Sequence, residues 1–530
     1  MSLESFVHDL HFETDKARPP ELEVDWEDAP LSYKLYRGLP VIPFSPEIPL
    51  SVETRDISGQ PDFHEIGHFL WYVYGLTQIC QSVLPLDARN EGMNIFHSYR
   101  RFTPSGGALY PNEIYVYLKL EDLPFGVYHY DVAHHRLILL REGDFDLYLR
   151  RALGNRCDVS ACFGTVFVST FFWKNFYKYY NFSYRLQGLD AGVVIGQLLE
   201  ASKRFGFASR VYVQFLDRAI NHLLGLSEQE ESVYAIIPLS KKPVNIRRVY
   251  KKEEKEADVS ATGLCRSLAA VRHNHYVRSR RVKEYPDLIR MNEASMLEST
   301  LSFKRIESKK CINYGLKVAF LPRVKKLGYD FAAVCRKRFS PEMDFVLGKV
   351  SNHELSALLQ EAAASFLYQN DLDEIGGTDR LTGNRVELYV CLHGVEGIPD
   401  GAYRYDGTFH ALWEIEPGNQ RFLLQRAMTF GNVNLFQVPF CFHVIGDKDH
   451  LKTVLGYRGY RIQQMEAGML VQHLLLAASA LGMGGHPLLG FNVSMCDEIY
   501  RLTREEKTCL IQIPVGYYRQ RPRLEGSIHS

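Results

Sequence analysis

The residues best suited to chemistry lie in one stretch, Arg100 to Glu113. It contains Arg101 and then the turn formed by Pro104, Ser105, Gly106 and Gly107. Two adjacent glycines allow backbone to approach a flat ligand, because no Cβ holds it away. The prolines stiffen the entry and the exit. The stretch has two interpretations: a ligand-binding turn, or a plain turn before the strand expected at residues 114–118.

Composition is ordinary for a soluble globular protein of 530 residues, a length that suggests two to four domains. The 62 basic and 62 acidic residues cancel, so overall charge favours neither nucleic acid nor membrane as a partner. The first residues lack a signal peptide's basic and apolar regions, and no apolar run is long enough for a bilayer. We therefore expect a cytoplasmic protein, with the apolar segment Leu470–Leu481 as a core helix.

Ten cysteines are scattered along the chain without any CxxC pair. Cys157 and Cys162 are close in sequence but have no second pair to complete a zinc site. We expect reduced thiols and no metal centre.

Going along the chain, residues 1–60 are rich in proline and acidic side chains and suggest an extended arm. A helix is expected from His64 to about Gly75, and a hairpin from Gly126–Asp131 and residues 135–140. A buried strand is expected at residues 164–170. Gly188 is expected to open a helix that ends near Arg204.

The second half repeats this order, which is the strongest organisational feature of the sequence. Gly-Val-Tyr-His-Tyr-Asp at Gly126 returns as Gly-Ala-Tyr-Arg-Tyr-Asp at Gly401, an offset of 275 residues. Tyr184-Arg185 returns as Tyr460-Arg461, an offset of 276. Two later landmarks keep that offset. The chain therefore consists of two copies of one α+β unit: copy one at 61–240 and copy two at 336–530.

The joint at 241–335 is basic and uneven, with clusters such as Lys251-Lys252 and Arg280-Arg281. Two interpretations stay open: a solvated linker with helical pieces, or a docking surface for an acidic peptide. Residues 318–321 are expected to form a short strand of copy two.

The turn motif, Tyr74-Gly75-Leu76-Thr77, the Gly126 motif and Leu189-Asp190-Ala191-Gly192 resemble those of SagB-type dehydrogenases, also called McbC-like or ThcOx-type. These enzymes belong to the nitroreductase superfamily. The resemblance covers most of 60–240 and, more weakly, 336–520. It implies tandem nitroreductase-like α+β domains that form an intramolecular pseudo-dimer with FMN at the interface. It also implies oxidation of thiazolines and oxazolines to thiazoles and oxazoles in a ribosomally synthesised peptide.

The family's catalytic Lys-Tyr pair precedes a Tyr-Arg, and Lys178-Tyr179 precede Tyr184-Arg185 at that spacing. Copy two has Val454-Leu455 there. Without the resemblance, a lysine in this aromatic run would be interpreted as an exposed surface residue with no role in catalysis. With it, Tyr179 is the candidate base, and Lys178 is expected to lower the tyrosine's pKa, although the two roles could be exchanged.

The Lys-Tyr pair is present in copy one alone, whereas the candidate phosphate contacts lie in copy two. Copy two has an arginine- and serine-containing segment before its first core helix, where the superfamily binds phosphate, whereas copy one offers only Thr54-Arg55-Asp56-Ile57. The turn motif is absent from copy two, which has Asp379–Asn384 there. The candidate contacts from copy two are Arg336, Arg338, Ser340, Gly484, Gly485 and Arg521.

These complementary losses predict one composite FMN site. Copy two would hold the phosphate through guanidinium forks. Copy one would hold the ring through Pro104, Ser105, Gly106 and Gly107, with Arg101 as a further cofactor contact, and would supply Lys178 and Tyr179. The alternatives are two ordinary sites, or none. The flavin would carry the redox chemistry and be reoxidised by oxygen.

Two other functions stay open: an NAD(P)H-dependent nitro or quinone reductase, and a non-catalytic scaffold. The expected partner of a peptide-modifying protein is a substrate peptide, and a cyclodehydratase complex is a further candidate partner. No HExxH, P-loop or persuasive nucleophile-elbow motif points to other chemistry.

Overall fold

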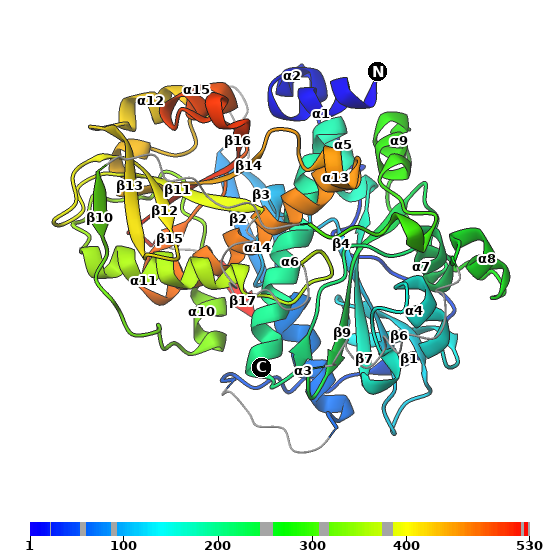
Figure 1. Cartoon of the computed structure of the whole chain (residues 1–530). Coiled ribbons are helices and arrows are strands. Elements are labelled where there is room, and N and C mark those ends of the chain that lie inside the picture. Colours follow the sequence, from blue (N-terminus) through cyan, green and yellow to red (C-terminus); the bar gives the residue numbers. More distant parts are fainter. Residues whose placement is uncertain are drawn as a thin grey trace.

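Two seven-stranded antiparallel sheets form the framework of the chain. The computed structural model describes residues 1–21, 23–52, 60–85, 93–243, 258–306, 317–373, 385–520 and 524–527. The sheets have strand orders β1-β6-β5-β4-β7-β9-β8 and β10-β13-β12-β11-β14-β16-β15. The second order is the first one repeated element by element, so the prediction of two copies of one α+β unit is confirmed (Figure 1).

The elements of the two copies correspond one to one. In copy one they are β1 (Val41–Pro43), α3 (Phe63–Tyr74), β4 (Asn112–Leu118), β5 (Gly126–Asp131), β6 (Arg136–Glu142), α4 (Asp146–Ala152), β7 (Gly164–Phe171), α5 (Trp173–Tyr179), α6 (Ser183–Arg204), β8 (Ala208–Ser209), α7 (Asp217–Leu224) and β9 (Glu231–Ser240). In copy two they are β10 (Val318–Phe320), α11 (Asn352–Ala363), β11 (Val386–Leu392), β12 (Gly401–Asp406), β13 (Ala411–Pro417), α12 (Arg421–Ala427), β14 (Phe440–Asp447), α13 (Lys452–Leu455), α14 (Arg458–Ala480), β15 (Gly484–Gly485), α15 (Val493–Ile499) and β16 (Lys507–Gly516).

Local sequence starts the first core helix of each copy in the same way. Asp62 and Glu65 form a capping box on α3, and Ser351 and Glu354 form one on α11. Each box gives partners to backbone N–H groups that the first turn leaves unpaired. The central strands β4 and β9 are buried along their whole length, and β7 is buried except at its last residue, Phe171. Continuous apolar runs therefore suit these strands better than alternation.

The long helices α6 and α14 cross between the two sheets and join the copies (Figure 1). A Cβ on Gly192 would lie 2.0 Å from Met465 O, and one on Gly468 would lie 2.1 Å from Leu189 O. Only glycine at these two places lets the helices approach so closely. Tyr184 and Tyr460, which correspond in the repeat, stack with ring centroids 5.8 Å apart.

Two expectations about elements need correction, and a third is confirmed. Helix α6 begins at Ser183 and not at Gly188, because Gly188 and Gly192 lie inside it, facing α14. The segment 1–60 is not simply extended: it contains α1 (Leu3–His11), α2 (Thr14–Ala17) and β1, which joins the first sheet. Strand β10 pairs with β13, as expected, and therefore belongs to the second sheet ahead of the boundary at 336.

The remaining elements connect the copies. In the joint the structure describes α8 (Ala261–Arg266), α9 (Pro286–Ala294) and α10 (Phe331–Lys337), while Lys251-Lys252 lie outside the described residues. A third sheet has the order β17-β2-β3. It pairs β17 (Leu524–Ser527) from the end of the chain with β2 (Gln78–Pro85), which pairs with β3 (Met93–Arg100).

Among the described residues, no helix is both long and apolar enough to cross a membrane. In the same part of the chain, no group of three histidine, cysteine or acidic side chains could hold a metal ion.

Candidate functional site

The glycine turn, residues 104–107, is fixed by a carboxylate of α6. Ser105 Oγ donates to Asp190 Oδ2 at 2.6 Å, and the Gly106 N–H donates to Asp190 Oδ1 at 3.2 Å. Ser105 Oγ also accepts from the Tyr110 N–H at 2.9 Å. The Ser105 hydroxyl is therefore used within the protein, and the backbone of the turn is what it offers a ligand.

Asp190 lies at this site, although the sequence indicated it only as part of the motif Leu189-Asp190-Ala191-Gly192. Burial raises the pKa of its carboxyl to about 7, while the hydrogen bonds from Ser105 and Gly106 act in the opposite direction. In copy two the corresponding Glu466 accepts hydrogen bonds from Tyr368 and Arg385. An acidic residue at this place on the long helix organises the neighbouring connection in both copies.

Lys178 and Tyr179, at the end of α5, lie against the turn. Gly107 has φ +64°, and a Cβ there would be 2.5 Å from Tyr179 Oη and 2.8 Å from Lys178 Nζ. The structure thus brings the two predicted catalytic residues together with the turn. Gly107 allows close approach of these side chains, a contact that the sequence analysis had assigned to a ligand.

The N-terminal segment closes the other side of this pair. Arg18 Nε donates to Lys178 O at 3.1 Å, and Lys178 Nζ lies 5.1 Å from the centre of the Trp26 ring. Sequence reasoning missed both residues, since nothing in a proline-rich segment indicates what it packs against.

The expected direction of one pKa shift is wrong. Burial raises the pKa of Tyr179 to about 12, with the charge of Asp190 adding to it. Burial also lowers the pKa of Lys178, and the charge of Arg18 lowers it further. An adjacent lysine was expected to favour the phenolate, but in a buried place loss of hydration dominates. Lys178 is therefore the better base and Tyr179 the better hydrogen-bond donor.

Arg101 does not point into this site. Its guanidinium donates to Tyr74 O at 2.9 Å and to Ser32 O at 2.8 Å, and lies 3.9 Å from the centre of the Tyr74 ring. Arg101 is almost fully buried. Its charge is satisfied by backbone carbonyls and an aromatic face, so it supports the fold beneath the turn.

The predicted phosphate segment of copy two meets copy one next to the turn. Arg338 Nε donates to Phe102 O at 2.8 Å, two residues before Pro104, and Arg338 Nη1 donates to Ser340 Oγ at 3.2 Å. Arg336 Nη1 donates to Leu50 O at 2.8 Å. Burial lowers the pKa of Arg338. The guanidinium of Arg338 and the hydroxyl of Ser340 are thus held beside the residue that leads into the glycine turn of copy one, while Arg336 contacts the N-terminal segment.

The two glycines of β15 allow close packing of two different neighbours. A Cβ on Gly484 would be 2.4 Å from Pro341 Cγ, so glycine there lets the residue after Ser340 lie directly on the strand. A Cβ on Gly485 would be 2.5 Å from Leu475 Cδ2, so glycine there lets α14 lie close to the strand. Arg521 lies outside the described residues.

This arrangement fits a flat cofactor with an anionic tail. Pro104, Ser105 and Gly106 are half-buried and Gly107 is exposed, so one face of the turn is accessible. Arg336, Arg338 and Ser340 are also half-buried. Guanidinium and hydroxyl donors suit phosphate oxygens, and accessible glycine backbone suits an aromatic ring. The residues present therefore fit FMN.

Comparisons with known proteins agree with this fold. Residues 381–517 match the model of the Nitroreductase family. The protein named as a nitroreductase, MJ1384, from Methanocaldococcus jannaschii is 27% identical over 134 residues, which are 25% of this chain and 64% of that protein. The trifolitoxin-processing protein TfxB of Rhizobium leguminosarum bv. trifolii is 31% identical over 131 residues, 22% of this chain and 34% of that protein.

The alignments thus span about a third to two thirds of these curated relatives. A solved structure, named as a nitroreductase from Anabaena variabilis, matches with a TM-score of 0.73 at 21% identity and covers 98% of this chain and 99% of that one. The chain therefore has the fold of the nitroreductase superfamily, present as two tandem copies.

Proposed function

We propose that this chain is an FMN-dependent oxidoreductase that dehydrogenates thiazoline or oxazoline rings in a ribosomally synthesised peptide. The observation that carries the proposal is the meeting of Arg338 from copy two with Phe102 of copy one. This contact supports Arg338 as a phosphate donor beside the turn that faces Lys178 and Tyr179. Neither copy has both parts within its described residues, so the site is composite.

The chain's own residues would orient the substrate and move a proton. Aromatising an azoline removes a hydride from one ring carbon and a proton from its neighbour, and a bound flavin would supply the hydride acceptor. Lys178 would take the proton, and the lowering of its pKa by burial favours the neutral amine that this step needs. Tyr179 stays protonated at neutral pH and donates a hydrogen bond to the ring heteroatom or its neighbouring carbonyl.

A peptide substrate is supported by the resemblance of the turn and the Lys-Tyr pair to SagB-type dehydrogenases. The relative TfxB is named for processing trifolitoxin, and 131 of its residues align with this chain. A cyclodehydratase that makes the azoline is the partner this chemistry requires. The aromatic and cationic side chains of the N-terminal segment, Trp26 and Arg18, lie beside the pair where a peptide would approach.

Substitution of the pair tests the proposal. Lys178→Ala and Tyr179→Phe should both purify yellow, because neither side chain belongs to the phosphate segment. Each should form azole from an azoline-containing peptide about 100-fold more slowly, since a positioned acid or base contributes at least that much. Turnover is measured as the loss of two hydrogens per ring by mass spectrometry.

Lys452→Ala is the matched control, because Lys452 belongs to α13, the counterpart of α5, and pairs with Glu4 at the surface. It should keep full activity. Unchanged azole formation in both catalytic variants would discard the assignment. Rapid bleaching by NADPH with nitro or quinone turnover and no azole would support the reductase, and a colourless protein would support the scaffold.

A further inference from the structure

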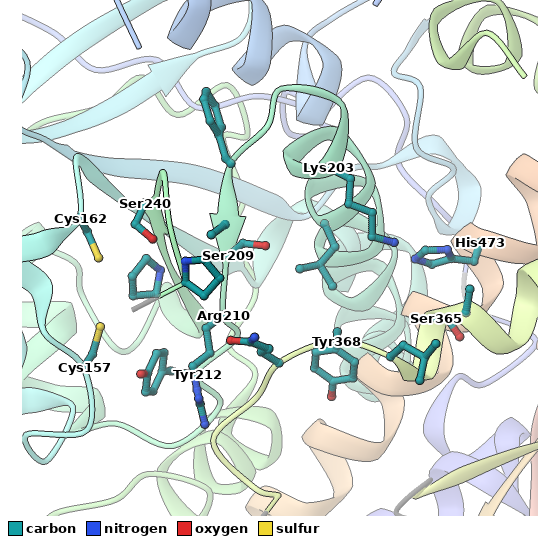
Figure 2. A pocket seen from close by; sticks show the side chains of 18 residues that line it. Cys157, Cys162, Lys203, Ser209, Arg210, Tyr212, Ser240, Ser365, Tyr368 and His473 are labelled. Carbon is teal, nitrogen blue, oxygen red and sulfur yellow. The ribbon is translucent and has the colours of Figure 1, made fainter. Parts of the chain in front are cut away.

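A cavity of about 230 Å³ lies between the copies, at the edge of the first sheet (Figure 2). Its walls include Ala208 and Ser209 of β8 on one side and Tyr368 of copy two on the other. Lys203, whose side chain is 54% exposed, also lines it, so the cavity reaches the surface there. By the repeat, Ala208 corresponds to Gly484, where Pro341 fills the equivalent place in copy two.

Two cysteines form one end of this cavity. Cys157 and Cys162 flank the 3-10 turn at residues 159–161, and both are free thiols, 3% and 4% exposed. Figure 2 shows their sulfur atoms pointing toward each other. Cys162 Sγ donates to Asp158 O at 3.6 Å. A five-residue separation across a tight turn thus places two thiols face to face beside solvent-accessible space.

Copy two shows that the fold does not need thiols at these positions. The equivalent residues, offset by 276, are Val433 and Val438, which flank the matching 3-10 turn at residues 435–437. Each is 1% exposed and packed in the apolar core of its copy. An apolar side chain without a thiol fills each of these positions in copy two, so the fold itself does not require a cysteine pair in copy one.

The surroundings favour a reactive thiolate at one of the two. The neighbouring Cys162 thiol lowers the pKa of Cys157, and the Tyr212 hydroxyl and the charge of Arg210 act in the same direction, against burial and Asp158. The pKa of Cys162 is raised, chiefly through its hydrogen bond to Cys157 and by burial. Arg210 Nε is buried and without a hydrogen-bond partner among the described residues. Cys157 is thus the better nucleophile toward an oxidant, and Cys162 is placed to react with the oxidised Cys157.

We propose that Cys157 and Cys162 form a redox-active dithiol that hydrogen peroxide converts to a disulfide within this cavity. The Cys157 thiolate attacks one peroxide oxygen and breaks the O–O bond, which gives a sulfenic acid and hydroxide. The Cys162 thiol then attacks the sulfenic sulfur, and the S–S bond forms with loss of water. The two sulfurs together lose two electrons, and peroxide is reduced to two waters. Peroxide would enter the cavity beside Lys203. The proposal does not depend on flavin, because the oxidant is peroxide itself.

Thiol mapping on the full-length protein tests this. The protein is treated with hydrogen peroxide, quenched, denatured, alkylated and digested, and peptides are weighed. We expect a Cys157–Cys162 disulfide that appears before any other thiol is lost. Cys391 and Cys441 are the internal controls: they are direct partners on β11 and β14, fully buried, with pKa values raised by burial.

Two single variants separate the roles of the cysteines. Cys162→Val should leave a sulfenic acid at Cys157 that dimedone traps, and Cys157→Val should give labelling of Cys162 about tenfold lower, because only a thiolate reacts readily. The double valine variant copies the sequence of copy two and should fold with unchanged thermal stability. Recovery of both thiols alkylated after peroxide, or equally rapid oxidation of Cys391 and Cys441, would overturn the proposal.

Discussion

Asp190 holds the glycine turn through hydrogen bonds from Ser105 and Gly106, and its pKa lies well above the ordinary value for a carboxyl. Its ordinary pKa of 3.8 rises to about 7 in the fold because the carboxyl is buried. Between these values the folded chain binds a proton that the unfolded chain releases. The contribution of Asp190 to the free energy of unfolding is therefore largest below about pH 4, falls as pH rises, and is constant above about pH 7.

Asp190→Asn should remove this pH dependence. Asparagine resembles the protonated carboxyl, since it can accept from the Gly106 N–H and donate to Ser105 Oγ. Between pH 5 and pH 8 the free energy of unfolding should fall less in the variant than in the wild type, by an amount on the order of a few kcal/mol. Thermal unfolding of both proteins at the two pH values measures the difference. Parallel curves would show that Asp190 is not the titrating group.

Gly107 offers a second test at this scale, because two separate effects oppose any larger residue there. Its φ of +64° costs a non-glycine residue roughly 1–2 kcal/mol. An added Cβ would also displace Lys178 and Tyr179. Gly107→Ala should therefore reduce azole formation in addition to stability.

Gly394→Ala is the control for Gly107, since Gly394 has φ +71° with nothing within 4 Å of an added Cβ. It should lose a similar amount of thermal stability and keep its turnover. Equal turnover in the two variants would mean that the contact between Gly107 and the Lys-Tyr pair has no part in catalysis.

At the scale of elements, sequence reasoning succeeded where the pattern was local or repeated. The hairpin of β5 and β6, the buried strand β7 and the helix ending at Gly75 follow from residue spacing. The start of α6 was missed because Gly188 and Gly192 have low helix propensity, and the reason for their presence is the approach of α14. A tertiary contact of this kind leaves no signal in the local sequence.

The candidate site shows the same limit. The meeting of the Arg338 segment with the turn of copy one was predicted from complementary motif losses. The burial that reverses the expected pKa shift of Tyr179, and the backbone carbonyls that occupy Arg101, depend on residues far apart in the chain. Which arginine is free for a ligand is decided by packing, and packing is not visible in a motif.

The crossing of α6 and α14 gives a prediction about an element pair. Gly468→Ala would ordinarily strengthen a helix, since alanine is favoured over glycine by about 1 kcal/mol in a helix interior. Here the added Cβ would lie 2.1 Å from Leu189 O and force the helices apart. We expect a lower melting temperature and weaker flavin retention together. A stabilised variant would show that the crossing is not as close as described.

At the scale of the whole molecule, the two copies have the same topology but differ in their candidate site residues. Copy one keeps the glycine turn and the Lys-Tyr pair, and copy two has Val454-Leu455 in place of that pair. Copy two keeps the arginine segment, which crosses to Phe102. In a symmetric dimer, two identical copies would form two equal sites. Here, among the described residues, the arginine segment and the glycine turn with its Lys-Tyr pair come together at one place.

Flavin stoichiometry distinguishes one composite site from two. We expect one FMN per chain, measured as flavin absorbance against protein concentration.

Arg338→Ala in copy two should weaken FMN binding by on the order of tenfold or more, because it removes a charged donor, and Gly107→Ala in copy one should weaken the same single site. In a chain with two sites, each variant would retain one tightly bound flavin of the two. Arg501→Ala, which removes an exposed ion pair with Glu416 far from the turn, should leave the stoichiometry unchanged. Two FMN per wild-type chain would end the composite-site proposal, because the second flavin would have to be held by the Asp379–Asn384 connection that lacks the Pro-Ser-Gly-Gly motif.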